Sequence, residues 1–185
     1  MNLRTFKGRI AVKPDPEKTQ IGLIHIPDSA RTPSTTGTVI SVGTECDVRK
    51  DDRVVFMKKA GHDLVVDGQP IIVMPEYEVL AVVVEEQLRA IGTMVIIKPE
   101  PPDERIGLIH IPDPAAARAR EKLVVGTIVA KGPGLRLKDG KRWPMADVKV
   151  GEKVLYFQNY VPEFEFKGEK YITVGDDSVR AVIED

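Results

Sequence analysis

The side chains best suited to chemistry in this sequence are three histidines and one cysteine, but their neighbours do not complete a reactive site. His25 and His110 have no cysteine or second histidine at the spacing of a metal site. Cys46 stands between Glu45 and Asp47, whose negative charges disfavour the thiolate that a nucleophile requires. We therefore expect no catalytic residue and no bound metal.

The sequence also offers little to a cofactor, a nucleic acid or a membrane. The Gly-Pro-Gly segment at residues 132–134 lacks the further glycines, the Lys-Ser/Thr pair and the following helix of a phosphate-binding loop. The formal net charge is −1, from 27 basic and 28 acidic side chains mixed along the chain, which favours no polyanionic partner. The longest apolar runs, such as residues 79–84, are too short to span a bilayer. We expect no cofactor, no nucleic acid and no membrane.

The cysteine content and the first residues indicate a compartment. A single cysteine excludes an intramolecular disulfide and fits a reducing environment. Residues 1–7 contain no apolar signal segment. Together these features predict a soluble protein of the cytoplasm.

The two histidines named above lie inside an octapeptide, Ile-Gly-Leu-Ile-His-Ile-Pro-Asp, that occurs twice, at residues 21–28 and 106–113. An eight-residue identity is far beyond chance, so the chain is best described as two copies of one unit. Charged, proline-bearing and small polar residues flank the octapeptide and cannot bury enough surface to order themselves. We expect a long mobile loop with an apolar middle, although these isoleucines could also be ordinary core residues.

The two copies align over most of their length, with insertions confined to loops. Residues 10–14 match residues 95–99, an offset of 85, and residues 37–40 match residues 126–129 at an offset of 89. From residues 53–56 and 153–156 onwards the offset stays at 100. Each copy has several short runs rich in Val, Ile, Phe and Tyr, broken by Gly, Pro or Asp. This pattern predicts an all-β protein of two tandem small β-barrels, each with a long mobile loop.

The expected domains are residues 1–87 and 91–185, joined by a short polar connector at residues 85–90 that should hold the barrels side by side. The best helix candidates are this connector and residues 115–122. The second domain has a segment, residues 132–143, whose length and turn residues suit a β-hairpin. The first domain has only residues 44–51 at the matching place, so a hairpin there should be short or absent.

These features resemble the GroES-type co-chaperonins, and the resemblance covers nearly all of both halves. It is carried by residues 1–4 leading into the strand at residues 8–13, the loop sequence Gly-Leu-Ile-His-Ile-Pro, residues 37–43, and the closing segments at residues 78–83 and 178–183. The resemblance implies a homo-oligomeric, ring-like lid that caps a nucleotide-bound chaperonin of the GroEL type. Such a lid encloses unfolded protein substrates while the chaperonin, not the lid, hydrolyses ATP.

The resemblance also implies where the chaperonin would bind. By position, the binding tripeptides are Ile24, His25 and Ile26 in the first copy and Ile109, His110 and Ile111 in the second, with Leu23 and Leu108 just before them. An extended segment alternates its faces, so alternate isoleucines could enter pockets of an apolar groove while the backbone fixes register.

The resemblance further suggests how chains join and where this sequence departs from the family. The opening strand of one barrel (residues 9–13 or 95–98) should pair with the closing strand of the next (79–84 or 179–183). The segment at residues 132–143 looks like the family's roof hairpin. Family members usually form seven-membered rings of single barrels, and no whole number of two-barrel chains supplies seven.

Two alternatives come from other functional classes. The chain could be an oligomeric β-barrel scaffold or adaptor that presents its paired loops to a partner other than a chaperonin. Zinc-dependent alcohol dehydrogenases also contain a GroES-like barrel, but they need a dinucleotide-binding fold and a Cys/His ligand set that this sequence lacks.

Overall fold

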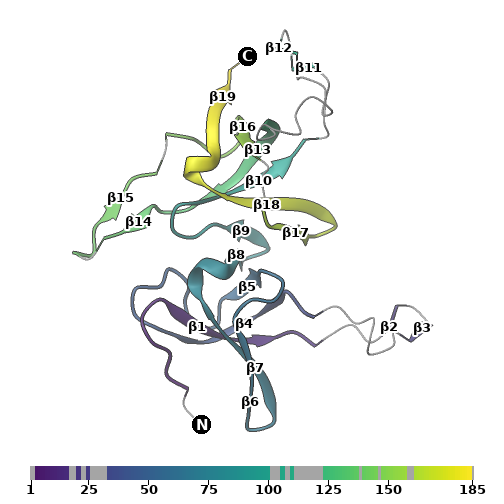
Figure 1. Cartoon of the computed structure of the whole chain (residues 1–185), viewed down its shortest axis with the longest axis vertical. Coiled ribbons are helices and arrows are strands. Elements are labelled where there is room, and N and C mark those ends of the chain that lie inside the picture. The colour runs from purple at the N-terminus through teal and green to yellow at the C-terminus, as the bar shows by residue number, and fades with distance from the viewer. Residues whose placement is uncertain are drawn as a thin grey trace. The chain divides into compact units, whose positions relative to one another are not determined.

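The computed structural model of the chain is built from antiparallel β-sheet (Figure 1). It describes residues 3–16, 20–21, 24–25, 33–100, 105–106, 109–110, 123–137, 139–145, 147–157 and 161–184. In these ranges the helical elements are two 3-10 turns, η2 (Glu76–Glu78) and η3 (Asp176–Ser178). The predicted all-β class is confirmed. The chain divides into two compact units, Met1–Gln87 and Leu88–Asp185.

The main sheet of the first unit has the strand order β6-β7-β1-β4-β5-β8-β9. Its strands are β1 (Arg9–Pro14), β4 (Thr36–Val42), β5 (Arg53–Phe56), β6 (His62–Val66), β7 (Gln69–Pro75), β8 (Val79–Val84) and β9 (Gln87–Arg89), the last of which runs across the boundary between the units. The hydrogen-bonded order among these strands is open, so closure into a barrel stays a prediction.

The second unit repeats this arrangement with the order β17-β18-β10-β13-β16-β19. Its strands are β10 (Met94–Pro99), β13 (Leu123–Lys131), β16 (Lys153–Phe157), β17 (Glu163–Phe166), β18 (Glu169–Gly175) and β19 (Val179–Ile183). A separate two-stranded hairpin pairs β14 (Leu135–Arg136) with β15 (Arg142–Trp143) and extends away from the sheet (Figure 1). At the matching place in the first unit, residues 44–51 form turns and bends.

The register of the strands reproduces the offsets between the two copies. Val12 faces Val39 in the β1–β4 pair, and Ile97 faces Ile128 in the β10–β13 pair, at offsets of 85 and 89. Both pairs carry a β-bulge at the same place, directly before Val12 and directly before Ile97. Because a one-residue slip would turn every side chain to the other face of the sheet, matching bulges show that the copies share one fold.

Period-two burial explains why these sequences form strands around a core. In β4 the buried residues alternate with half-exposed ones, and Val39 is fully buried. The second unit has an equivalent core cluster, which includes Val95, Ile97, Ile128, Val154, Tyr156 and Ile172. β-branched side chains suit such positions because they pack well on a pleated surface.

The connector between the copies is a tight β-turn instead of a helix, which corrects one helix expectation. Glu85 and Glu86 have φ values of 47° and 63°, the left-handed conformation of both central residues in a two-residue hairpin turn. Residues 87–89 then continue as β9 beside β8. Glutamate is an unusual residue at such positions, so sequence alone gave no signal for the turn. The other helix candidate, residues 115–122, lies outside the described residues.

The expectation about how chains join is wrong in one respect. β1 lies between β4 and β7, and β10 lies between β13 and β18, so both opening strands are interior. Their backbone groups already take part in two ladders over most of their length. Neither opening strand is therefore an edge that another chain could extend.

A buried phenol distinguishes the second core from the first. The side chain of Tyr156 is fully buried, and its hydroxyl has no hydrogen-bond partner in the described part of the chain. The equivalent residue in the first unit is Phe56. Burial, with a smaller contribution from the charge of Glu163, raises the pKa of Tyr156 to about 12.

Replacing Tyr156 by phenylalanine is expected to increase the free energy of unfolding by about 1 kcal/mol, because an unsatisfied buried hydroxyl is removed. The ordinary pKa of tyrosine is 10, so neutral Tyr156 does not oppose folding through ionisation below pH 10. Stability is lost as the pH rises from 10 towards 12, because the unfolded state ionises first. Urea denaturation at neutral and alkaline pH measures both effects. The reverse change, Phe56→Tyr, should destabilise, and a destabilised Tyr156→Phe variant would contradict the interpretation.

Candidate functional site

In both copies the octapeptide takes part in a short antiparallel pairing that begins one residue before it. In the first copy β2 (Gln20–Ile21) pairs antiparallel with β3 (Ile24–His25), with Ile21 facing Ile24. In the second copy β11 (Arg105–Ile106) pairs with β12 (Ile109–His110), with Ile106 facing Ile109. Each repeat therefore forms a short hairpin, whereas the sequence predicted a long mobile loop whose binding tripeptide is extended. We call these two elements the loop hairpins.

The expected binding residues are only partly within the described ranges. The backbones of Ile24 and His25 lie in β3, and those of Ile109 and His110 lie in β12. The remaining four residues of the expected site lie outside the described residues: Leu23, Ile26, Leu108 and Ile111.

The base of the first loop is held to the sheet by an acid–base contact. The Asp15 carboxylate accepts two hydrogen bonds from the Arg53 guanidinium, each 2.8 Å long, and one of 2.5 Å from the Thr36 hydroxyl. The Asp15 N–H also donates to the Thr36 carbonyl oxygen at 2.9 Å. These bonds tie together the strands that enter and leave the loop, β1 and β4, and the neighbouring strand β5.

The second loop has an equivalent contact made from different side chains. The Glu100 carboxylate lies 3.1 Å from the Lys153 ammonium and accepts a 3.2 Å hydrogen bond from the Thr127 hydroxyl. Glu100 and Lys153 are the counterparts of Asp15 and Arg53 at offsets of 85 and 100. Sequence analysis missed both contacts, although an acid and a base recurring at matched positions is a signal that could have found them.

Close backbone approach also fixes the loop ends. Gly37 faces Pro14, and Gly126 faces Pro99, at the last pairs of their ladders. A Cβ at Gly37 would lie 2.5 Å from the Lys13 carbonyl oxygen, and one at Gly126 would lie 2.4 Å from the Ile97 side chain. The two ends of each loop, at the last pairs of the β1–β4 and β10–β13 ladders, are therefore held close together.

The described part of the chain shows little sign of a catalytic or metal-binding site. Burial, reinforced by the charges of Glu76 and Asp47, raises the pKa of the Cys46 thiol to about 11, so the thiolate is scarce at neutral pH. No group of three or more metal-ligating side chains gathers within the described ranges. None of the helices described there has the length and hydropathy to cross a membrane.

The fold and the loops define a class of protein: two repeated antiparallel β units, each presenting the same short apolar hairpin from a clamped base. Comparison with known proteins gives the family. The model of the family described as "Chaperonin 10 Kd subunit" matches residues 2–83 and again residues 87–183. The chain therefore belongs to the Cpn10, or GroES, co-chaperonin family and carries two copies of its domain. That family is non-enzymatic, as the sequence had indicated.

Individual relatives match about half of this chain. Co-chaperonin GroES of Bifidobacterium animalis subsp. lactis is 49% identical over 79 residues, which are 43% of this chain and 74% of the relative. Co-chaperonin GroES of Rhodothermus marinus is 36% identical over 100 residues, 54% of this chain and 94% of the relative. The protein of the same name from Geotalea daltonii is 37% identical over 99 residues, 53% of this chain and 98% of the relative.

Proposed function

We propose that this chain is a co-chaperonin that caps a GroEL-type chaperonin ring in its nucleotide-bound state and encloses unfolded proteins for folding. The observation that carries the proposal is the pair of loop hairpins, which present one identical octapeptide from two family domains. The binding residues are the apolar positions of that octapeptide, Ile24 and Ile26 with their counterparts Ile109 and Ile111. The protein acts in the cytoplasm, without a cofactor of its own.

Weak binding by each individual loop hairpin suits this function. Burying two isoleucines contributes roughly 3–6 kcal/mol before the entropy of ordering the loop is subtracted. A comparable ordering cost leaves each loop with a low net affinity. Loops held on one assembly bind together with a high effective concentration, so a ring binds well while each contact stays reversible. The clamped loop bases favour this arrangement, because they limit the space that each hairpin samples.

Strand edges support an assembly of several chains. β8 has β5 on one side and β9 on the other, whereas β19 has β16 alone beside it among the strands that the structure describes. Ala81 in β8 is fully buried, but its counterpart Ala181 in β19 is exposed. At the offset of 85, β9 corresponds to residues 2–4 of the chain. We therefore assign the partner of β19 to residues 2–4 of a second copy, in place of the interior opening strands.

Deletion of residues 1–4 is expected to leave single chains in solution, because the edge of β19 then has no strand to pair with. Sedimentation velocity measures the change, and circular dichroism verifies that the sheets persist. Substitution of the exposed Arg4 by Ala, which keeps the backbone, is the control and should assemble normally. Full assembly of the truncated chain would contradict this edge assignment.

A lid of this kind would carry roof hairpins only from its second units. The β14–β15 hairpin places Leu135 opposite Trp143, and the first unit has turns and bends where it would stand.

Function is tested by refolding a chaperonin-dependent enzyme with a GroEL-type chaperonin and ATP. Addition of this chain should raise the yield of active enzyme. No increase in yield and no chaperonin binding would favour the adaptor alternative.

A further inference from the structure

A hollow on the first unit is lined by none of the residues assigned to chaperonin binding. Three neighbouring strands end or begin at it, because β6 begins at His62, β7 ends at Pro75 and β1 begins at Arg9. Neighbouring strands here are antiparallel, so these three ends lie at one edge of the sheet. The hollow has a volume of about 470 Å³, which is within the range of small-molecule sites.

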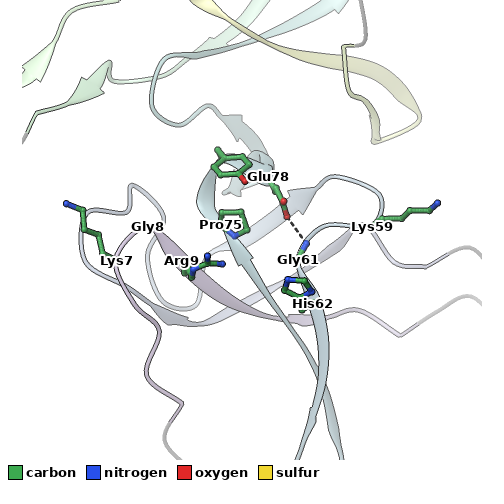
Figure 2. Close-up of a pocket in the computed structure, with 9 residues that line it drawn as sticks. Lys7, Gly8, Arg9, Lys59, Gly61, His62, Pro75 and Glu78 are labelled. Atoms are coloured by element: carbon green, nitrogen blue, oxygen red, sulfur yellow. Dashed lines mark hydrogen bonds between the residues drawn. The ribbon is translucent and has the colours of Figure 1, made fainter.

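Basic side chains line the hollow from two segments that are far apart in the sequence. Lys7 and Arg9 belong to the start of β1 and the turn before it, and Lys59 and His62 belong to the start of β6 and the turn before it. Figure 2 shows Arg9 and His62 near the centre of the hollow, with Lys7 and Lys59 towards opposite sides. A ligand in the hollow would therefore meet nitrogen groups on more than one side.

The backbone around the hollow is held by hydrogen bonds. The Gly8 carbonyl oxygen accepts a 3.0 Å hydrogen bond from the Glu76 N–H, and the Gly61 N–H donates to the Glu78 carboxylate at 2.7 Å. Gly61 has a φ of 60°, and its close approach to the Val73 carbonyl oxygen leaves no room for a Cβ. Both basic segments are thus fixed to η2 and β7 before any ligand binds, which lowers the entropic cost of binding.

The charges of the hollow are only partly balanced. Glu78 is the acid among the lining residues. Lys7 pairs with Glu45 at 2.7 Å, but both side chains are well exposed, so this pair is weak and Lys7 can turn to a ligand. Arg9 and Lys59 are exposed, and neither has an ion-pair partner among the residues that the structure describes. These two cations against one carboxylate leave an excess of positive charge.

The second unit lacks these cations although it shares the strand framework. At the offset of 85, Arg9 corresponds to Met94, and at the offset of 100, Lys59 corresponds to Asn159. The fold itself therefore does not require basic residues at these positions. Their presence in one unit of the pair favours a role other than folding.

We propose that the hollow binds a small phosphate-bearing ligand, with Arg9 and Lys59 as the main binding residues. The planar fork of a guanidinium matches two phosphate oxygens at once, and a lysine ammonium adds a point charge. The hollow is larger than a phosphate ion needs, and Tyr77, which is 67% exposed, adds an aromatic wall for an organic part of the ligand. The site is separate from the octapeptide anchors, so the proposal does not rest on chaperonin capping.

Isothermal titration calorimetry of the free full-length chain tests the site, with phenyl phosphate as the probe. Phenyl phosphate should saturate one site per chain, because the second unit lacks the cations. Benzoate, which has the ring but a single negative charge, should bind at least about tenfold more weakly. Inorganic phosphate separates the two sources of the group: weaker binding than phenyl phosphate indicates an organic phosphate, and equal binding indicates free phosphate as the ligand.

The variants R9Q and K59Q should each weaken binding of phenyl phosphate about tenfold, because each loses a charge-assisted hydrogen bond. E78Q should instead strengthen binding a few-fold, because it removes the acid of the lining and keeps an acceptor for the Gly61 N–H. K50Q is the matched control, because Lys50 is exposed outside the hollow and loses the same charge. Circular dichroism verifies the folding of each variant.

The proposal is overturned if neither phosphate compound binds saturably, if benzoate binds as well as phenyl phosphate, or if K50Q weakens binding as much as R9Q. Should R9Q fail to fold, R9K takes its place and should weaken binding several-fold, because it keeps the charge but loses the guanidinium fork. All these titrations are made without chaperonin, so a negative result leaves the proposed capping function standing.

Discussion

Serine in place of Ile24, Ile26, Ile109 and Ile111 is expected to weaken binding to a GroEL-type chaperonin by more than about a hundredfold. Each buried isoleucine contributes about 1.5–3 kcal/mol, and every 1.4 kcal/mol is about tenfold in affinity. Loss of two anchors in a single loop already removes most of its net affinity. Because the loops of an assembly bind together, their individual losses multiply in the avidity of the lid.

The measurement is binding of the assembled variant to immobilised chaperonin in the presence of ATP. Variants with only the first or only the second pair of isoleucines replaced report whether both loop hairpins engage. The control replaces Leu64 and Val65, which are 45% and 77% exposed in β6, with serine. This control removes exposed apolar side chains outside the loops, so it should bind normally. Unchanged binding of the fourfold variant would reject the assignment of the octapeptide as the anchor.

The largest loss of stability is expected from Gly43→Ala. A Cβ at this position would lie 1.7 Å from the carbonyl oxygen of Phe6, and the Gly43 N–H donates to the Arg9 carbonyl oxygen at 2.8 Å. The backbone on both sides of Gly43 is therefore held in place and cannot move aside as a flexible side chain would. Overpacking of this kind costs about 3 kcal/mol. Gly132, the counterpart at the offset of 89, approaches the Gly92 carbonyl oxygen in the same way, at 2.2 Å.

Urea denaturation of Gly43→Ala measures this loss, with Gly68→Ala as the matched control. Gly68 has open space around its Cβ direction and a φ of 74°, so alanine there should cost only about 1 kcal/mol of conformational strain. Gly132→Ala should behave like Gly43→Ala. Equal stability of the Gly43 and Gly68 variants would show that the backbone around Phe6 relaxes more easily than its hydrogen bonds indicate.

Much of the fold follows from local sequence because the strands carry strong signals. The β-branched runs ending in Pro14 and Pro99 became β1 and β10, and the offsets between the copies reappear in the register of the ladders. The Asp67–Gly68 and Lys167–Gly168 turns have positive φ at both residues, as two-residue hairpins require. A repeated sequence reinforces each of these signals, since both copies must form the same strands.

Other features depend on neighbours that sequence does not name. The Glu85–Glu86 turn places glutamates in a conformation that usually selects Asn, Asp or Gly, so its signal was absent. The interior position of β1 depends on pairing with β7, about sixty residues away, rather than on its own composition. The loop hairpins and the acid–base contacts at Asp15 and Glu100 likewise arise from pairs of segments that local patterns treat separately.

The central claim is that this two-domain chain caps a chaperonin ring. Native mass spectrometry of the protein mixed with a GroEL-type chaperonin tests it most directly, with ATP present in one sample and nucleotide omitted from the other. The account predicts a complex of the chaperonin with a whole number of chains, formed only with nucleotide, and a homo-oligomer of the protein alone. Failure to detect any complex in the presence of ATP, from a protein that does form its own oligomer, would contradict it.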